Sequence, residues 1–396
     1  MRLESGLTRR GLAGFFLSGL LVSFLAALLP AWGFHLTSAY DRAAHYFFSL
    51  NLGILIGARY SYLLLSRKRI RTTLILACVI AFGGMLGLSA SGPPASHWLR
   101  VGFLLAVGVA AGLLHAGLFH VITPAYQHNP AATVNLAGTF FGLGCLLSAL
   151  MVAGTFYIYT TGSIVFLLAL LPAFFAGMYA KCPLIDAPLK PKRTFRESLE
   201  DFSRPAAVLF ALVLFFQFGN EWALAGWLPL FLIQRLGISP ASSLLMLALY
   251  WLSLLVGRIV AQAILPHFSH ARLLVACVLS AWFGCAVLWF TNNVFGASIG
   301  ILFTGAGFAG IYPLVVERIG GRFPYYHPGF FNGIFSLAFT GGLLAPGTLG
   351  YCADRWGIGV VVGLPLLGSA AVFVLLSLLW LESKLSGVAG VTAGSA

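Results

Sequence analysis

The chain has few charged residues. Only 8% of its 396 residues are Asp, Glu, Lys or Arg, and only ten residues are acidic. A soluble globular protein carries about 25% charged residues, so this composition excludes a soluble fold. The hydrophobic fraction of 60% and the mean hydropathy of +0.95 point the same way. We therefore expect an integral membrane protein.

The sequence also lacks the cysteine spacing of a metal or redox site. Its six cysteines contain no CxxC pattern and fall mostly within apolar stretches, which argues against a disulfide framework. His115 and His120 are five residues apart and so lie on different faces of a helix, unlike convergent metal ligands. We expect no metal and no cofactor.

Twelve long apolar runs fill the chain. Each is close to the roughly 20 residues that a helix needs to cross a bilayer, and none has the alternating polarity of a barrel strand. The runs cover residues 11–36, 43–66, 72–90, 99–123, 131–155, 162–181, 205–234, 241–265, 273–291, 295–316, 331–353 and 357–381. The sequence therefore predicts an all-α integral membrane protein with twelve transmembrane helices.

The basic residues give an independent test of this count. If both termini are cytoplasmic, all but four of the 23 Lys and Arg residues fall on the cytoplasmic side; the exceptions are Arg42, Arg100, Arg235 and Arg355. Such a bias is typical of cytoplasmic loops. We expect a multi-pass protein of the bacterial inner membrane with cytoplasmic termini. Anionic headgroups account for the net charge of +13, and no nucleic-acid partner is expected.

A single polar segment divides the chain. Residues 182–204 are rich in charged residues and proline and predict a cytoplasmic linker. An N-terminal six-helix bundle, residues 1–181, would precede it, and a C-terminal bundle, residues 205–396, would follow. Residues 195–202 are expected to form a short amphipathic helix on the membrane surface.

The two halves resemble each other at a nearly constant offset. Arg59 corresponds to Arg258 at an offset of 199, and Asn135 corresponds to Asn332 at an offset of 197. Internal duplication is common in transporters. It predicts two six-helix bundles related by pseudo-twofold symmetry.

Short motifs in the fifth, seventh, eighth and eleventh runs carry a family resemblance. They are Asn135 with Phe140-Phe141-Gly142-Leu143-Gly144, Asn220-Glu221-Trp222 with Gly226-Trp227-Leu228-Pro229, Tyr250-Trp251 followed by Gly257-Arg258, and Arg322-Phe323-Pro324. Together they resemble the major facilitator superfamily and, within it, the fucose permease-like branch of sugar:proton symporters. The resemblance implies a secondary active transporter, not an enzyme, that moves a small polar solute such as a sugar by alternating access.

The chain departs from this branch in its acidic residues. Sugar symporters of the branch carry acidic residues in their first and fourth spans, and this chain has none there. Glu221 is the one acidic residue well inside a predicted span. Because an ionised carboxylate facing lipid is costly, Glu221 should face an aqueous cavity or a partner. Burial favours a protonated carboxyl group, so Glu221 is the candidate for proton coupling. The alternative is that it only packs against a neighbouring helix.

Further polar and aromatic residues at mid-span depth are candidates for solute contact. Amides, a carboxylate and indole rings together suit a hydroxylated ligand, although each aromatic residue and His115 could equally be a packing residue. The candidate substrate-binding residues are Gln217, Asn220, Glu221, Trp227, Tyr250, Trp251, His115, Asn51, Tyr312 and Asn332.

Arg258, Glu317 and Arg322 lie near the cytoplasmic ends of their predicted spans. We expect a pair between Arg258 and Glu317, extended by Arg322, to act as a gate at the inner ends of the C-terminal bundle. The alternative is that these side chains reach the interface separately.

Other function classes remain open. An exporter or flippase of amphiphilic compounds or lipids would also suit an aromatic-rich, charge-poor interior. A membrane-embedded enzyme or a non-transporting sensor is disfavoured because no group of catalytic residues converges. The expected partners are a small-molecule substrate, protons and membrane lipids, and we expect a monomer.

Overall fold

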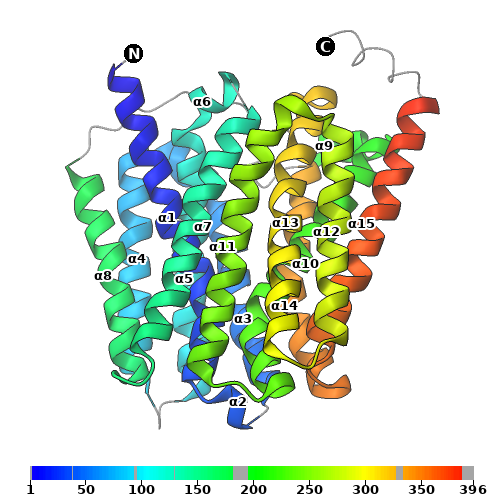
Figure 1. Ribbon diagram of the computed structural model, residues 1–396. Helices are drawn as coiled ribbons and strands as arrows, with labels where there is room; N and C mark the ends of the chain where they lie inside the picture. The colour runs from blue at the N-terminus through cyan, green and yellow to red at the C-terminus, as the bar shows by residue number, and fades with distance from the viewer. Residues whose placement is uncertain are drawn as a thin grey trace.

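The computed structural model describes residues 2–37, 39–92, 96–128, 130–181, 195–326 and 333–385. Regular structure in these residues is helical. The long helices run side by side from one end of the molecule to the other (Figure 1).

Within the described residues, twelve helices are long and apolar enough to cross a membrane. They are α1 (Arg2–Ala31), α3 (Tyr40–Arg67), α4 (Ile70–Ala90), α5 (His97–Val121), α7 (Pro130–Thr155), α8 (Thr161–Ala180), α10 (Pro205–Leu236), α11 (Pro240–Ile264), α12 (His270–Phe290), α13 (Val294–Arg322), α14 (Gly333–Trp356) and α15 (Val360–Leu385). The short helices are α2 (Phe34–Thr37), α6 (Thr123–His128), α9 (Phe195–Phe202) and the 3-10 turn η1 (Leu265–His267). The prediction of twelve spans is confirmed.

Several helix ends differ from the predicted runs, among them the ends of α1 and α13. The first run was expected to continue to residue 36, but α1 ends at Ala31 and α2 follows. Gly33 has a φ of 78°, in the left-handed region that ends a helix. The tenth run was expected to end at residue 316, but α13 continues to Arg322. The short helix predicted at 195–202 is present as α9.

The long helices form two bundles. In the first, α3 packs on α5, α1 on α7 and α4 on α8; in the second, α10 packs on α14 and α15, and α12 on α13. This arrangement confirms the predicted two-bundle fold. Residues 182–194 of the expected linker lie outside the described residues, and the division at residues 181 and 205 stays a prediction.

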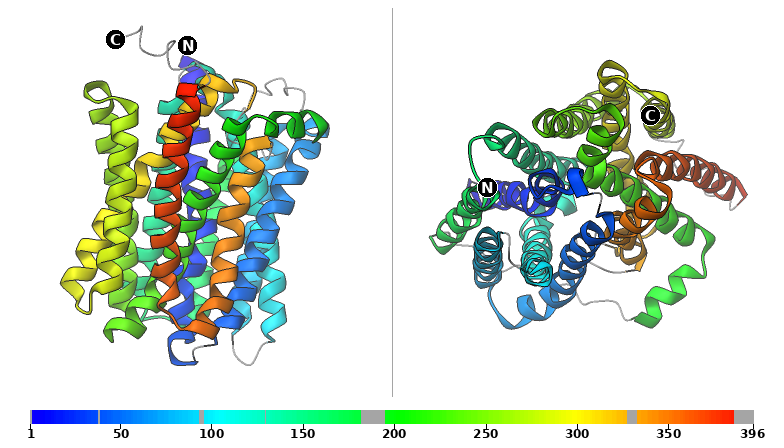
Figure 2. Two further views of the ribbon diagram at one scale, coloured as in Figure 1. Left: turned by 90° about the vertical axis from the view of Figure 1, so that its right-hand side faces the viewer. Right: turned by 90° about the horizontal axis from the view of Figure 1, so that it is seen from below.

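The start of α1, the end of α15 and the helix α9 lie at the same end of the molecule (Figures 1 and 2). We call this end the terminal side and the other end the opposite side. The helices α3 and α11 therefore both run from the opposite side toward the terminal side, whereas α1, α7 and α10 run the other way.

Glycines bring α3 and α5 into backbone contact. A Cβ atom at Gly108 would lie 2.9 Å from the Cα of Gly53, and a Cβ at Gly57 would lie 2.9 Å from the backbone nitrogen of Leu113. Real Cβ atoms do not approach other atoms so closely. Small residues of this kind allow close helix packing inside membranes.

Candidate functional site

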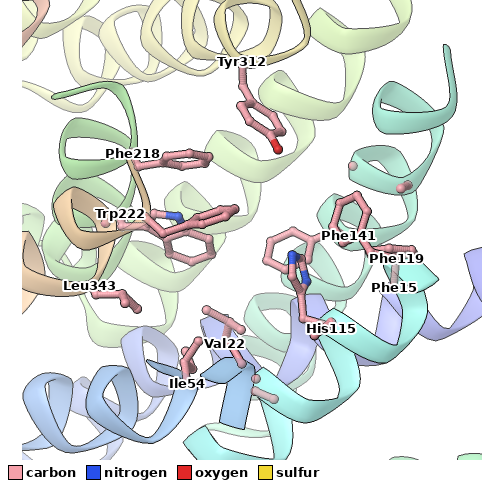
Figure 3. Close-up of a pocket in the computed structure, with 18 of the residues that line it drawn as sticks. Phe15, Val22, Ile54, His115, Phe119, Phe141, Phe218, Trp222, Tyr312 and Leu343 are labelled. Carbon is pink, nitrogen blue, oxygen red and sulfur yellow. The ribbon is translucent and has the colours of Figure 1, made fainter. Parts of the chain in front are cut away.

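A cavity of about 170 Å³ lies between the two bundles near the middle of the long helices. Its walls are mostly aromatic and aliphatic. The first bundle contributes Phe15, Phe119 and Phe141, and the second contributes Phe218, Trp222 and Phe339. Figure 3 shows Phe218, Trp222 and Tyr312 on one side of the cavity, facing His115 and Phe141 on the other.

Five polar side chains interrupt this apolar lining. They come from five different helices: Asn51 (α3), His115 (α5), Glu221 (α10), Arg258 (α11) and Tyr312 (α13). The hydroxyl of Tyr312 points into the cavity (Figure 3). A few convergent polar groups in an otherwise apolar cavity are typical of a small-molecule site.

The midpoint of α10 places Glu221 on the cavity. Phe218 and Trp222 are one helical turn apart and flank it, and all three side chains line the cavity. Glu221 is only 5% exposed. The side chain of Gln217, one turn earlier, interacts with its carboxyl group. A residue of the second bundle therefore positions Glu221, and Glu221 lines the cavity that separates this bundle from the first.

Arg258 reaches from α11 to the first bundle. Its side chain is 7% exposed, and Nη1 donates a hydrogen bond to the backbone oxygen of Gly138 in α7. Gly138 leaves room for the guanidinium, which a Cβ atom at this position would overlap. The Nε of Arg258 is buried without a hydrogen-bond partner. The guanidinium thus joins the bundles and retains unused donors.

Glu221 and Arg258 do not form a direct ion pair, although both belong to the described part of the chain. They interact electrostatically at longer range. Among the cavity-lining residues they are the one carboxyl group and the one guanidinium. The cavity therefore holds one acid and one base near its centre.

The first bundle holds His115 in place. Its Nδ1 lies 3.2 Å from Ser18 Oγ, and its ring packs edge-on against Phe15 and Phe119, with centroids 5.7 and 5.0 Å away. Because an unpaired imidazolium among phenyl rings would be costly, we take His115 as neutral.

The bundles meet through different helices on the two sides of the cavity. From the middle toward the opposite side, Asn51 Nδ2 donates to Leu343 O at 2.7 Å, and Gln234 Nε2 donates to the backbone oxygen of His35 at 2.8 Å. Toward the terminal side, Asn135 Nδ2 donates to Gln262 Oε1 at 2.7 Å.

Two residues predicted to contact the solute point away from the cavity. Gln217 and Asn220 turn into the interior of the second bundle: Gln217 is fully buried next to the backbone of Phe308, and Asn220 packs against Gly368. The sequence prediction put both with Glu221 on one side of the helix, but in the structure their contacts are with other helices of the second bundle. Phe218 and Trp222 occupy the cavity face instead.

Trp227 was also expected on the cavity, and this prediction is wrong. Its ring is fully buried, and Nε1 donates to Pro346 O at 2.8 Å. The ring packs against Tyr40 and Phe47. Trp227 lies six residues beyond Glu221, about 9 Å farther along the helix, where the bundles close on the opposite side.

Tyr250 and Trp251 were predicted to contact the solute, but neither lines the cavity. Both are buried in the second bundle. Trp251 packs behind Trp222, with ring centroids 5.9 Å apart. Asn332 lies outside the described residues. Of the ten candidates, Asn51, His115, Glu221 and Tyr312 lie on the cavity.

The expected pair between Arg258 and Glu317 is absent from the described residues. Glu317 instead lies 3.1 Å from His270 Nε2. Arg322 was expected to extend the pair, but it binds both carboxylate oxygens of Glu382, at 2.6 and 3.1 Å. Depth along the span correctly grouped these residues near one side, but it could not show that Arg258 turns toward the other bundle.

The sequence prediction missed most of the aromatic wall. Phe141 and Trp222 meet across the bundles at right angles, with centroids 5.8 Å apart. The available signal was the spacing of Phe218 and Trp222 around Glu221. The phenylalanines of α1, α5 and α7 carried no comparable signal, because apolar residues occur all around those helices.

A family model described as Major Facilitator Superfamily matches residues 128–346, more than half of the chain. The sialic acid transporter NanX of Escherichia coli (strain K12) is 26% identical over 201 residues, which are 48% of this chain and 48% of that protein. The alignment thus spans about half the length of this curated relative.

Solved structures share the fold over almost the whole chain. The fucose:proton symporter FucP of E. coli superimposes with a TM-score of 0.66 at 15% identity, covering 94% of this chain and 98% of FucP. The nucleoside transporter NupG gives a TM-score of 0.70 at 13% identity, covering 95% and 99% of the two chains. Identities this low establish similarity of fold alone.

Proposed function

This chain belongs to the major facilitator superfamily and is a secondary transporter, and from this premise we propose that it moves a small hydroxylated solute of the sugar class with a proton bound at Glu221. The observation that carries the proposal is the position of Glu221. It is a buried carboxyl group in the central cavity, where both bundles meet. Acidic groups at such depth commonly serve proton transfer in transporters.

The contacts between bundles support alternating access. Different helix pairs join the bundles on the two sides of the cavity, α3 with α14 on one and α7 with α11 on the other. Rocking of one bundle against the other would loosen one set of contacts while keeping the other. We assign the terminal side to the cytoplasm, because the basic residues of the loops gather there.

Two observations support the proposed solute class. The names of the similar proteins mention sialic acid, fucose and nucleosides, all of which carry several hydroxyl groups. The cavity offers hydrogen-bonding groups on Asn51, Glu221 and Tyr312 for hydroxyls and aromatic rings for the carbon face of a sugar ring.

Uptake into proteoliposomes over a sugar panel, with and without an imposed proton gradient, tests the proposal. We expect the gradient to drive accumulation in the wild type. Glu221→Gln should abolish this accumulation while exchange of internal for external solute survives, because exchange does not require proton release. Glu200→Gln, on the exposed face of α9, is the matched control and should behave as wild type.

Two results would contradict the proposal. Gradient-driven uptake that persists in Glu221→Gln would remove Glu221 from coupling. Absence of sugar transport under every condition would favour the second candidate, an exporter or flippase of amphiphilic compounds. The observation in favour of that candidate is the ring of phenylalanines around the cavity, and uptake of an amphiphilic dye into inverted vesicles would test it.

A further inference from the structure

The empty cavity is electrically balanced when Glu221 is ionised. Glu221 contributes a negative charge when it is ionised, and Arg258 contributes a positive one. Both side chains are more than nine-tenths buried. A net charge at the centre of a membrane is costly, so the forms of the transporter that reorient most readily are those in which the charges in the cavity cancel.

Arg258 is poorly satisfied in this state. An arginine has five N–H donors, and the hydrogen bond found for this side chain in the described residues runs from Nη1 to Gly138 O. The edge formed by Nε and Nη2 stays unused, and Nε is buried without a partner. Two N–H groups on one edge of a guanidinium match the two oxygens of a carboxylate.

We propose that the solute is a sugar acid, whose carboxylate binds Arg258 and whose passage is coupled to one proton on Glu221. This inference rests on the proposed function and narrows its solute class. With the anion bound and Glu221 protonated, the negative charge lost from Glu221 is replaced by that of the solute. The loaded cavity is again neutral.

This charge balance slows the reorientation of a transporter that has bound only the anion or only the proton. The anion without the proton leaves a net negative charge in the cavity, and the proton without the anion leaves Arg258 uncompensated. Both forms would reorient slowly. Coupling between proton and solute therefore follows from charge balance and needs no direct contact between the two sites.

The other titratable groups near the pair do not change this count. His115 faces the cavity from α5, packed among phenyl rings. Tyr250 and the thiol of Cys145 interact electrostatically with both members of the pair, and Tyr312 lines the cavity. Phenols and thiols inside a membrane are neutral at physiological pH.

A neutral sugar is expected to behave differently. Its binding leaves the cavity balanced only while Glu221 stays ionised, so it would cross without a proton. An acid and its methyl ester differ in this charge and little else, and they form the matched pair of solutes for the test.

The experiment measures uptake of D-galacturonate and N-acetylneuraminate, and of their methyl esters, into proteoliposomes in which a pH gradient and a membrane potential are imposed separately. For an acid, we expect accumulation that follows the pH gradient and changes less than about twofold with the potential. Symport of a proton with a neutral solute would instead change accumulation about 50-fold per 100 mV. For the esters we expect equilibration without accumulation.

Substitution of Arg258 tests whether its guanidinium binds the carboxylate of the solute. Arg258→Gln should weaken the apparent affinity for the acid about 10-fold to 100-fold, with little effect on the ester. Arg258→Lys keeps the charge without the planar fork and should give an intermediate affinity. Arg100→Gln, in the first turn of α5 and away from the cavity, is the control. If Arg258→Gln does not fold, the comparison of acid and ester in the wild type still tests whether accumulation requires the carboxylate of the solute.

The outcomes distinguish this inference from the proposed function. Driven transport of neutral sugars with rejection of both acids would overturn the inference and leave the proposed function intact. Transport of an acid that responds strongly to the potential would overturn the electroneutral coupling. Failure of acids and neutral sugars alike would remove the proposed function and the inference together.

Discussion

The two bundles have the same number of long helices, but different groups fill their interiors. In the first bundle, α3 and α5 touch backbone to backbone through glycines. In the second, buried polar atoms of Gln217, Asn220, Tyr250 and Ser369 lack protein partners. Buried polar groups of this kind commonly bind internal water. Glycines also bring α12 against α13 and α10 against α14 in the second bundle, so close packing is common to both bundles. What distinguishes the second bundle is its polar groups, since the carboxyl group of Glu221 and the guanidinium of Arg258 both come from it.

Equivalent arginines show the same contrast. Arg59 in α3 and Arg258 in α11 are related by the internal duplication, yet Arg59 is exposed and Arg258 is buried against α7. The duplicated position has therefore acquired a role in one bundle that its counterpart does not share in this state.

The largest effect is expected from breaking the glycine contact of the first bundle. In Gly108→Val, the new side chain meets the backbone oxygen of Leu50 and the Cα of Gly53, and neither can move without separating the helices. We expect a loss of about 3 kcal/mol or more, seen as loss of the monodisperse peak in size-exclusion chromatography in detergent. Gly102→Val, on the same helix with open space around it, is the control. Equal yields of the two variants would refute close packing as the basis of the first bundle.

An intermediate effect is expected where a polar cluster stabilises the second bundle. Asp201 of α9 is buried and accepts hydrogen bonds from the hydroxyls of Tyr325 and Tyr326, each at 2.6 Å. Asp201→Ala removes both and should destabilise the protein by about 2 kcal/mol, as measured by thermal unfolding in detergent. The adjacent exposed change Glu200→Ala should stay within about 0.5 kcal/mol. Equal stability of the two variants would show that polar contacts contribute little here.

The smallest effect is expected at the exposed arginine. Arg59→Gln should change solute uptake less than about twofold, in contrast to Arg258→Gln. The measurement is the initial rate of uptake at a subsaturating solute concentration, with both variants at equal protein levels. A large loss of uptake rate in Arg59→Gln would mean that Arg59 and Arg258 have similar roles over the transport cycle. The proposed difference between the two bundles would then be wrong.

Much of the fold could be predicted because each transmembrane helix is a local feature. Length and hydropathy define it, so the twelve spans and α9 followed from the sequence. Glu221 was found by the same reasoning, since an acid inside a span is conspicuous. Side-chain direction was harder to predict: Asn220 and Trp227 lie on the helix of Glu221, but their neighbours on other helices decide where they point. The partner of Arg258 is a backbone oxygen, which leaves no trace in the identity of a side chain.

That backbone acceptor bears on how this protein can change over generations. A salt bridge between two side chains is lost when either codon mutates, but no substitution in α7 deletes the carbonyl oxygen to which Arg258 donates. Residue 138 is constrained only in size, because the guanidinium occupies the space that a Cβ atom would need. Natural selection on this link should therefore fix the identity of residue 258 and the smallness of residue 138, and relatives that lose the arginine should be free to carry larger residues at the facing position.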